Sequence, residues 1–365
     1  MAQRWASLQK LLETGVSQGV FTGAVALAGI KGELRWEGAA GALSRDPGAA
    51  SVTAATVFDL ASLTKPLATT LALMVLAGQG KLDVATPLGQ VLSAEWLPPD
   101  KRPLTLRSLL THRAGLPAWR PFYQEVLAIP PEARPARLER LAAATLLEYP
   151  PDTATLYSDL GFMLLKAVVE SLSGQTLDRF CREAIYRPLG LGLLGFNPLK
   201  QPGGERLSFA ATEPGLIPGR PPGGEVHDEN AWAAGGVAGH AGLFGPGHEV
   251  FRLVACLWQA YTGEETGPLN PAAVQHFLTV PPGAHRACGF DTPGPDPATR
   301  AAGRYFSPRS VGHLGFTGTS FWLDLETGQM VVLLTNRVHL GRDDKSRIAA
   351  FRPHFHEAAS QALGF

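Results

Sequence analysis

This sequence has few cysteines and a formal net charge of zero. Of its 365 residues only three are cysteines, Cys181, Cys256 and Cys288, which are scattered and lack metal-ligand spacing. This usage disfavours a disulfide scaffold, so we expect reduced thiols and a cytoplasmic protein. Lys plus Arg and Asp plus Glu number 32 each. That balance favours neither a nucleic-acid partner nor an anionic membrane surface.

Long apolar runs and the signatures of several enzyme classes are also missing. We identify no run of about 18 apolar residues, and the N-terminus leads into an amphipathic pattern in place of a secretory signal, so we expect no membrane partner. There is no His-Glu-x-x-His, no Gly-x-x-x-x-Gly-Lys and no Gly-x-Gly-x-x-Gly after a predicted strand. Possible ligands at His227–Glu229 and His354–Glu357 lack metal-site spacing, so we expect no metal and no cofactor.

The periodicity of the chain predicts strands at both ends and helices between them. An apolar period of helical type covers residues 3–19, and a hairpin is expected where residues 23–29 and 33–38 flank a Lys-Gly turn. The middle of the chain, from about 66 to 195, is mainly helical. Further elements are predicted as strands at 311–316, 320–325 and 329–336, and a last helix at 344–362 that kinks or breaks at Pro353.

These elements indicate one unit with two lobes. We expect an α/β (α+β) fold with an antiparallel sheet of about five strands, whose edges come from the two termini and whose faces carry helices. Residues 1–60 and 305–365 would form the α/β lobe, and residues 61–304 an inserted, mainly helical lobe with long loops. Two Gly/Pro-rich stretches, 197–224 and 281–309, are predicted as long ordered loops; whether the first acts as a lid stays open.

The stretch from Asp59 to Leu73 holds the first candidate for chemistry. Ser62 and Lys65 are three residues apart, so on a helix they share a face. A hydroxyl beside an amine in apolar surroundings is the minimum set of groups needed for an activated nucleophile. The alternative is a Ser cap followed by a solvated Lys. Ser7 and Lys10 form a second Ser-x-x-Lys pair. They fall opposite the apolar stripe of their helix, so we expect this pair to be exposed and inert.

Two further motifs distinguish Ser62 from Ser7. Tyr157, with Asp159 two residues later, lies at the start of a predicted helix, where a Tyr near an ammonium could carry a proton. Late in the chain, Gly315 lets a ligand approach the strand that carries His313, which makes the Phe316 N–H an oxyanion donor beside the Ser62 N–H. Taken singly, these motifs also fit a packed aromatic before an Asp cap and a turn with a surface His.

Together the motifs resemble the serine β-lactamase and penicillin-binding-protein superfamily, and most closely its class C-like branch with the family VIII carboxylesterases. The order is Ser-x-x-Lys, then Tyr-x-Asn/Asp, then Lys/His-x-Gly. Residues 109–116, Leu-Leu-Thr-His-Arg-Ala-Gly-Leu, are similar to a family segment, and residues 226–231 and 239–244 are similar to a stretch of one subgroup. The resemblance covers roughly residues 20–340 and is specific to superfamily, not to substrate.

The resemblance implies roles for single residues. Ser62 matches the nucleophile that becomes acylated, Lys65 the group that helps remove its proton, and Tyr157 the second proton carrier. The backbone N–H groups of Ser62 and Phe316 match the oxyanion hole. Asp159 and His313 stand where Asn and Lys are usual. Asp159 should favour the Lys65 ammonium, which leaves more of the base work to a Tyr157 phenolate. The Lys usual at position 313 helps to bind the carboxylate of a substrate. His313 is mostly neutral near pH 7, so this anion-binding element is weakened.

The sequence therefore predicts a serine hydrolase that forms an acyl-enzyme on Ser62. A carboxylesterase on small or medium acyl esters is expected first, and a D-amino-acid peptidase or amidase, or weak β-lactamase activity, next. A catalytically silent binding protein of the same fold is the remaining alternative. The partner expected is a small-molecule ester or amide, with no nucleic acid and no membrane. The natural substrate, the oligomeric state and which of Lys65 and Tyr157 is the main base stay open.

Overall fold

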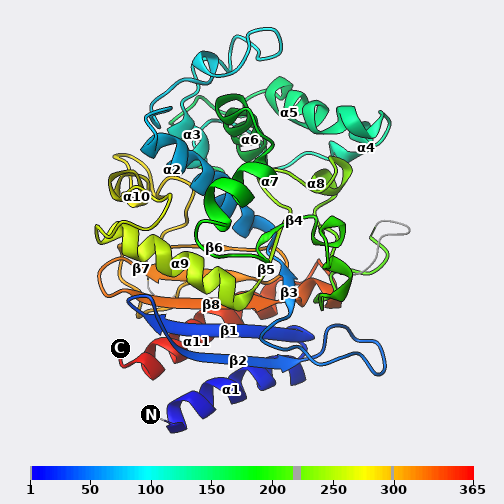
Figure 1. Cartoon of the computed structure of the whole chain (residues 1–365), viewed down its shortest axis with the longest axis vertical. Coiled ribbons are helices and arrows are strands. Elements are labelled where there is room, and N and C mark those ends of the chain that lie inside the picture. Colours follow the sequence, from blue (N-terminus) through cyan, green and yellow to red (C-terminus); the bar gives the residue numbers. More distant parts are fainter. Residues whose placement is uncertain (1, 217–222, 297–299) are drawn as a thin grey trace.

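The central element is a five-stranded antiparallel sheet in the order β2-β1-β8-β7-β6. The computed structural model describes residues 2–216, 223–296 and 300–365. The strands are β1 (Gly23–Ile30), β2 (Glu33–Gly41), β6 (Ser310–Leu314), β7 (Ser320–Asp324) and β8 (Gln329–Thr335). One edge, β2, comes from the N-terminal part of the chain and the other, β6, from the C-terminal part. The predicted fold class and sheet are confirmed (Figure 1).

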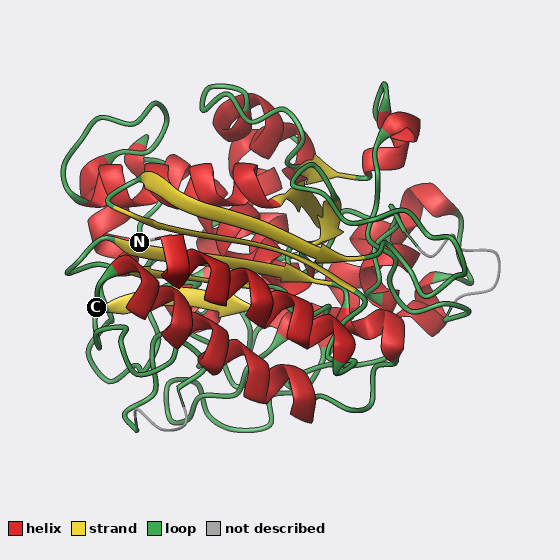
Figure 2. Cartoon of the chain, turned by 90° about the horizontal axis from the view of Figure 1, so that it is seen from below, coloured by secondary structure: helices red, strands yellow, loops and turns green. Residues whose placement is uncertain are grey.

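Helices cover both faces of this sheet. Figure 2 shows α1 (Ala2–Ser17) and α11 (Ser346–Leu363) lying side by side on one face. Leu8 and Leu12 of α1 pack with Phe355 of α11 in one buried cluster, because the apolar residues of each helix fall on a single stripe. The expected break at Pro353 is absent, since α11 continues through that residue. The opposite face is covered by α9 (Gly247–Tyr261), which packs against β8 and β1.

The position of α9 corrects the predicted division into lobes. This helix falls inside 61–304, the range expected to form the helical lobe, yet its apolar residues Val250 and Leu257 are buried and the helix lies on the sheet. An amphipathic helix packs on whichever apolar face is open, and sequence distance does not reveal which one that is. Of the two long loops, residues 217–222 and 297–299 lie outside the described residues, so the lid question concerns a segment that is only partly described.

The second lobe consists of helices around a buried core, with a small sheet beside it. The small sheet has the order β3-β5-β4, from β3 (Val57–Asp59), β5 (Leu243–Pro246) and β4 (Gly195–Phe196). The helices are the π-helices Lys65–Thr70 and Cys181–Tyr186, and α2 (Leu71–Gly78), α3 (Leu106–Leu110), α4 (Tyr123–Val126), α5 (Arg134–Ala144), α6 (Asp159–Ser173), α7 (Leu177–Phe180), α8 (Glu229–Ala233) and α10 (Pro271–Leu278). Short 3₁₀ helices lie at Ala61–Leu63, Leu88–Gln90, Pro131–Ala133, Pro198–Lys200, Gly204–Arg206 and Arg337–Leu340.

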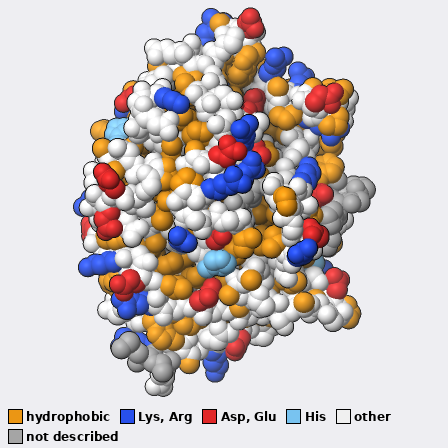
Figure 3. Space-filling model, in the orientation of Figure 1, with side chains coloured by type: hydrophobic (Ala, Val, Ile, Leu, Met, Phe, Trp, Pro, Cys, Tyr) orange, Lys and Arg blue, Asp and Glu red, His pale blue; other side chains and the backbone are white. Residues whose placement is uncertain are grey.

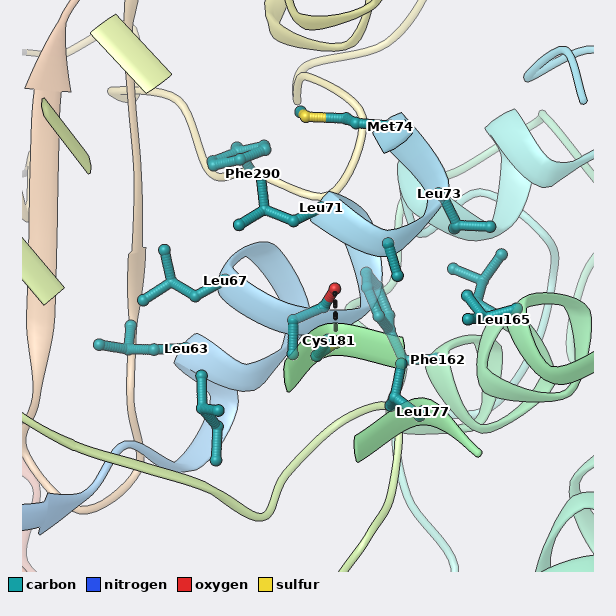
Figure 4. Packing of buried hydrophobic residues seen from close by; sticks show 14 of the residues in the cluster. Leu63, Leu67, Leu71, Leu73, Met74, Phe162, Leu165, Leu177, Cys181 and Phe290 are labelled. Atoms are coloured by element: carbon teal, nitrogen blue, oxygen red, sulfur yellow. Dashed lines mark hydrogen bonds between the residues drawn. The ribbon is translucent and has the colours of Figure 1, made fainter. Parts of the chain in front are cut away.

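The segment that carries Ser62 runs through the middle of the core. Figure 4 shows Leu63, Leu67 and Leu71 along this segment, with Phe162 and Leu165 among the side chains packed around it. Residues Ala61–Gly78 are long and apolar enough to span a membrane, with a mean hydropathy of 1.3 over 18 residues, which corrects the expectation that no such run exists. Because 83% of this stretch is buried inside the protein, its apolar surface is that of a core helix.

Charge is spread over the surface without a large patch of one sign on the face in view. In Figure 3, basic and acidic side chains are interspersed, with apolar side chains between them. This distribution agrees with the equal numbers of acidic and basic residues, 32 each, in the sequence. All three cysteines are buried and free.

Candidate active site

The nucleophile lies in a tight turn between β3 and the core helix. Ala61, directly before Ser62, has a φ of 48°, a conformation that costs a non-glycine residue about 1–3 kcal/mol. The buried Asp59 carboxylate offsets this cost, since Oδ1 accepts the Ala61 N–H at 2.8 Å and Oδ2 accepts the His227 N–H at 2.6 Å. Asp59 therefore joins the nucleophile turn to the loop before α8. Sequence reasoning missed this residue.

Lys65 is fully buried and has three acceptors. Its Nζ lies 3.2 Å from Ser62 Oγ, 3.1 Å from the His240 carbonyl oxygen and 2.6 Å from Asp159 Oδ1. Burial by itself would lower the pKa of Lys65, but the Asp159 carboxylate and Tyr157 outweigh it, and the pKa is raised above its ordinary value. The predicted effect of Asp159 thus has a direct structural basis: in the resting site Lys65 is an ammonium.

Tyr157 lies over the same ammonium, with the Lys65 Nζ 4.8 Å from its ring centroid. Burial raises the pKa of the Tyr157 phenol, and this effect outweighs the opposing influence of Lys65 and of the Ser62 hydroxyl. The resting site therefore holds a phenol at Tyr157, so a phenolate could carry more of the base work only after this proton is lost. Desolvation of the charged form was not visible in the sequence.

His112 holds the Tyr157 loop in place. Its Nδ1 accepts the Ser158 N–H at 3.1 Å, and its ring centroid lies 4.5 Å from that of Tyr157. Burial, and then the nearby Arg286 and Lys65, lower the pKa of His112 well below its ordinary value, so the ring is neutral and can accept. The 109–116 segment that resembles the family pattern contains this residue and was the signal that could have identified it.

Gly315 and Phe316 lie in the turn between β6 and β7, one step beyond the strand on which they were expected, because β6 ends at Leu314. A Cβ on Gly315 would stand 1.9 Å from Thr319 Oγ1 and 2.9 Å from the Leu60 carbonyl, so only glycine fits. Thr317 Oγ1 donates to the Asp59 carbonyl at 2.8 Å. This bond ties the turn to the nucleophile segment, so the turn with Phe316 is fixed beside Ser62.

Two buried arginines support this turn from behind. Arg352 donates to the carbonyls of Gly315 and Thr319, at 2.6 and 2.8 Å, and Arg337 donates twice to the Phe316 carbonyl, at 3.0 and 2.9 Å. Cations that fix these carbonyls also orient the peptide units, which is what an oxyanion-binding N–H requires. Neither arginine was singled out in the sequence.

His313 is buried, and its Nδ1 lies 2.9 Å from the Leu314 carbonyl oxygen. Burial, followed by the charges of Lys65 and Arg286, lowers the pKa of His313 well below its ordinary value. The ring, 5.9 Å from that of Tyr157, is therefore neutral. A neutral imidazole gives no ionic contact to a substrate carboxylate, in line with the weakened anion-binding element predicted from the sequence.

These elements meet at a cleft of about 400 Å³. Its wall includes Ser62, Tyr157, Asp159 and Phe316, four of the predicted site residues; Lys65 lies beneath the floor. The other lining residues are Ala61, Trp119, His227, Asp228, Glu229, His240, Ala241, Arg342 and Lys345. Trp119 and Phe316 are large apolar side chains that stay partly exposed there, and such surface on a cleft wall is typical of a ligand site.

Most charged residues of the cleft already have partners. His227 pairs with Glu213 at 3.0 Å and Glu229 with Arg342 at 2.7 Å, contacts that order the surrounding loops. Asp159, Asp228 and His240 have polar atoms within 4.8 Å of one another, a spacing that could suit a metal ion. Because the Lys65 ammonium already supplies positive charge at Asp159, we assign no metal to them.

Two other serine motifs, both with their serine on α1, are not part of the cleft. Ser7 and Lys10 are exposed on α1, as predicted. The segment Gly15–Gly19 matches Gly-x-Ser-x-Gly, the nucleophile elbow of α/β-hydrolases, but Ser17 is exposed at the end of α1 and donates back to the Thr14 carbonyl at 3.0 Å. An elbow needs a turn from a strand into a helix, so this match is without catalytic meaning.

A serine hydroxyl, a buried lysine and a partly buried tyrosine between a core helix and an edge strand are the arrangement of the serine hydrolases with a β-lactamase/transpeptidase fold. The chain belongs to this family: the model described as Beta-lactamase matches residues 8–352. An Escherichia coli K12 protein named "Putative D-alanyl-D-alanine carboxypeptidase" is 34% identical over 307 residues, 79% of this chain and 70% of that protein.

Solved structures agree in fold. EstCE1, described as a hydrolase with promiscuous acyltransferase activity, has a TM-score of 0.74 at 24% identity, over 98% of this chain and 99% of that one. The octameric penicillin-binding protein homologue from Pyrococcus abyssi has a TM-score of 0.73 at 19% identity, over 98% of this chain and 76% of that one. At such identities the likeness concerns the fold.

Proposed function

We propose that the protein hydrolyses small or medium acyl esters through an acyl-enzyme on Ser62. The observation that carries the proposal is Ser62 Oγ, 3.2 Å from the buried Lys65 Nζ and facing the cleft. Trp119 and Phe316 give the cleft wall an apolar surface, and the imidazole of His313, behind Tyr157, is neutral; both features favour an uncharged substrate over an anionic one.

The reaction would begin with loss of one proton from the resting pair of Lys65 ammonium and Tyr157 phenol. Ser62 Oγ then attacks the ester carbonyl while its proton passes to the Lys65–Tyr157 pair, and the N–H groups of Ser62 and Phe316 receive the oxyanion. Collapse breaks the C–O bond, and the pair returns a proton to the leaving alkoxide. Water, deprotonated by the same pair, then cleaves the acyl-enzyme and restores Ser62.

A peptidase acting on D-amino-acid peptides is the second candidate. Lys345 lines the cleft, is exposed, and places its Nζ 4.7 Å from the Phe316 ring centroid. An exposed ammonium beside the proposed oxyanion hole would suit a carboxylate at the leaving-group end of a substrate. The relative named as a carboxypeptidase supports this reading. Weak β-lactamase activity and a catalytically silent binding role are the remaining alternatives.

The test compares p-nitrophenyl esters of increasing chain length, a D-Ala-D-Ala peptide and a chromogenic cephalosporin, with wild type, Ser62→Ala and the exposed control Ser7→Ala. We expect ester turnover to be fastest, lost in Ser62→Ala and unchanged in Ser7→Ala. Ester hydrolysis that persists in Ser62→Ala would rule out the mechanism. Faster turnover of the peptide or the cephalosporin would reverse the order of activities. A fluorophosphonate that leaves Ser62 unmodified, judged by mass spectrometry, would support the silent alternative.

A further inference from the structure

The side chains of Asp228 and His240, in the segments 226–231 and 239–244, have no role in the chemistry described so far, yet both line the cleft. His240 Nε2 lies 2.9 Å from Asp228 Oδ1, and His240 is 1% exposed. Asp228 also caps α8, because the same Oδ1 accepts the Ala231 N–H at 2.8 Å. This hydrogen-bonded pair of carboxylate and imidazole lines the same cleft as Ser62, so it lies where it can influence the catalytic groups.

The pair reaches Lys65 through the loop that carries His240. The His240 carbonyl accepts from Lys65 Nζ at 3.1 Å. On either side, Thr69 Oγ1 donates to the Gly239 carbonyl at 2.7 Å, and the Leu243 N–H donates to Thr64 Oγ1 at 3.0 Å. The loop is thus hydrogen-bonded at three points to the helical segment 64–69 that follows Ser62, and the His240 ring connects the loop to Asp228 at the start of α8. If the ring lost its partner, one of the three acceptors of Lys65 would be free to move.

The pair also brings a second negative charge to the ammonium. Burial would raise the pKa of Asp228, but His240, the Ala231 N–H and Lys65 lower it to about 2, so this carboxylate is ionised at every working pH. The groups that act on Lys65 are Ser62, Tyr157, Asp159, the His240 carbonyl, Asp228, and the neutral rings of His112 and His313. The Arg286 guanidinium faces the same site, 5.7 Å from the Tyr157 ring centroid. Asp159 and Asp228 are the anions among these groups.

We propose that Asp228 and His240 are positioning residues for Lys65, which hold its ammonium beside Ser62 and favour its charged state. The inference rests on the proposed acyl-enzyme chemistry at Ser62. The imidazole fixes the place of an acceptor, and the carboxylate fixes the imidazole and adds to the field at Lys65. In this way α8 and the 239–243 loop become part of the proton-transfer machinery, although neither is expected to touch the reacting atoms.

Three variants separate geometry from charge. Asp228→Asn keeps a helix cap and an acceptor for His240 but removes the charge. The pKa of Lys65 then falls, so the limb on which kcat/KM rises with pH should move to lower pH, by less than in an Asp159→Asn protein, with little change in the plateau. His240→Gln retains an N–H donor for Asp228 and should keep most of the plateau. His240→Ala should lower kcat about 10–100-fold with KM nearly unchanged.

Glu139→Gln is the control, because the partly buried Glu139 lies 2.6 Å from a buried lysine, Lys166, and neither residue lines the cleft. It should change thermal stability and leave the pH profile as in wild type. On the plateau of the pH profile, the double variant Asp228→Ala/His240→Ala should lose no more kcat than the more impaired of Asp228→Ala and His240→Ala, since there both residues act through the one contact that places the His240 carbonyl. A folded Asp228→Asn protein with an unmoved limb, or effects that multiply in the double variant, would overturn the inference. Wild type without Ser62-dependent turnover would instead overturn the proposed function.

Discussion

Asp159 places a carboxylate oxygen 2.6 Å from Lys65 Nζ, at a position where the family usually carries an amide. An amide could accept a hydrogen bond from the ammonium, but it would bring no net charge. The ion pair therefore holds the lysine in the protonated form in which it cannot take the Ser62 proton. Since burial also keeps Tyr157 protonated, the resting site has one proton too many for acylation, and the rate should rise with pH.

Asp159→Asn should release part of this restraint. Without the carboxylate the charged form of Lys65 loses stabilisation, its pKa falls, and the neutral amine is present at lower pH. The rising limb of kcat/KM should move to lower pH by about 1–3 units, with higher activity at neutral pH. The measurement is a pH–rate profile on a p-nitrophenyl ester. Asp152→Asn, an exposed change in the same loop, is the control. An unmoved limb would show that Asp159 does not set the charge of Lys65.

Tyr157→Phe removes the second proton carrier while keeping the ring that packs on His112. We expect kcat to fall about 10²–10⁴-fold, because both protonation of the leaving group and activation of water lose their phenol. If deacylation depends on Tyr157 more than acylation does, the acyl-enzyme should accumulate. Rapid-quench mass spectrometry would then find Ser62 acylated. Steady turnover within a few-fold of wild type would exclude Tyr157 as a proton carrier.

The fold and the central site residues were accessible from the sequence because each carries a local signal. The hairpin at 23–38 consists of two short apolar runs around a Lys-Gly turn, and Ser62 and Lys65 have a helical spacing inside an apolar run. The small sheet and the place of α9 left no such signal, because packing partners far apart in the chain decide them. The run Ala61–Gly78 was also not recognised as an apolar stretch, although its mean hydropathy of 1.3 is high enough for a membrane span or a buried core helix.

The supporting residues of the site show the same limit. Asp59, Arg337 and Arg352 act through hydrogen bonds to backbone groups. Polar side chains at other positions could make the same hydrogen bonds, so no motif in the sequence marks these three residues. The protonation of Tyr157 was misjudged for a related reason. The neighbouring ammonium could be inferred from the motif, but the loss of solvent around the phenol follows only from three-dimensional packing.

Stability should decrease as the pH falls below the ordinary histidine range. Burial lowers the pKa of His356 to about 3, while the unfolded chain binds the same proton near 6.5. The unfolded state therefore takes up protons first, and each such histidine removes about 1.4 kcal/mol of stability per pH unit between those two values. His112 and His313, whose pKa values are also well below the ordinary one, add to the slope.

Chemical denaturation between pH 7.5 and 4.5 would measure this slope. His356→Gln should lower stability at pH 7.5, because contacts with Ser320 and the Ala301 carbonyl are disturbed, and should flatten the slope by about one proton. His248→Gln, at an exposed histidine, should leave the slope unchanged. An equal slope in wild type and His356→Gln would mean that this histidine does not contribute to acid unfolding.

Gly315→Ala tests the oxyanion hole without touching the nucleophile, the lysine or the tyrosine. The added methyl group would meet Thr319 Oγ1 at 1.9 Å and the Leu60 carbonyl at 2.9 Å, so the turn must move away from the Ser62 segment and carry the Phe316 N–H with it. Loss of one oxyanion donor costs about 10²–10³ in kcat. Gly195→Ala, where a Cβ meets nothing within 4 Å, is the matched control and should retain activity. Both variants would be compared by ester turnover and by melting temperature. A Gly315→Ala protein that melts like wild type and turns over esters at the wild-type rate would show that the placement of the Phe316 N–H is not needed, because the steric conflict leaves the turn no way to stay where it is.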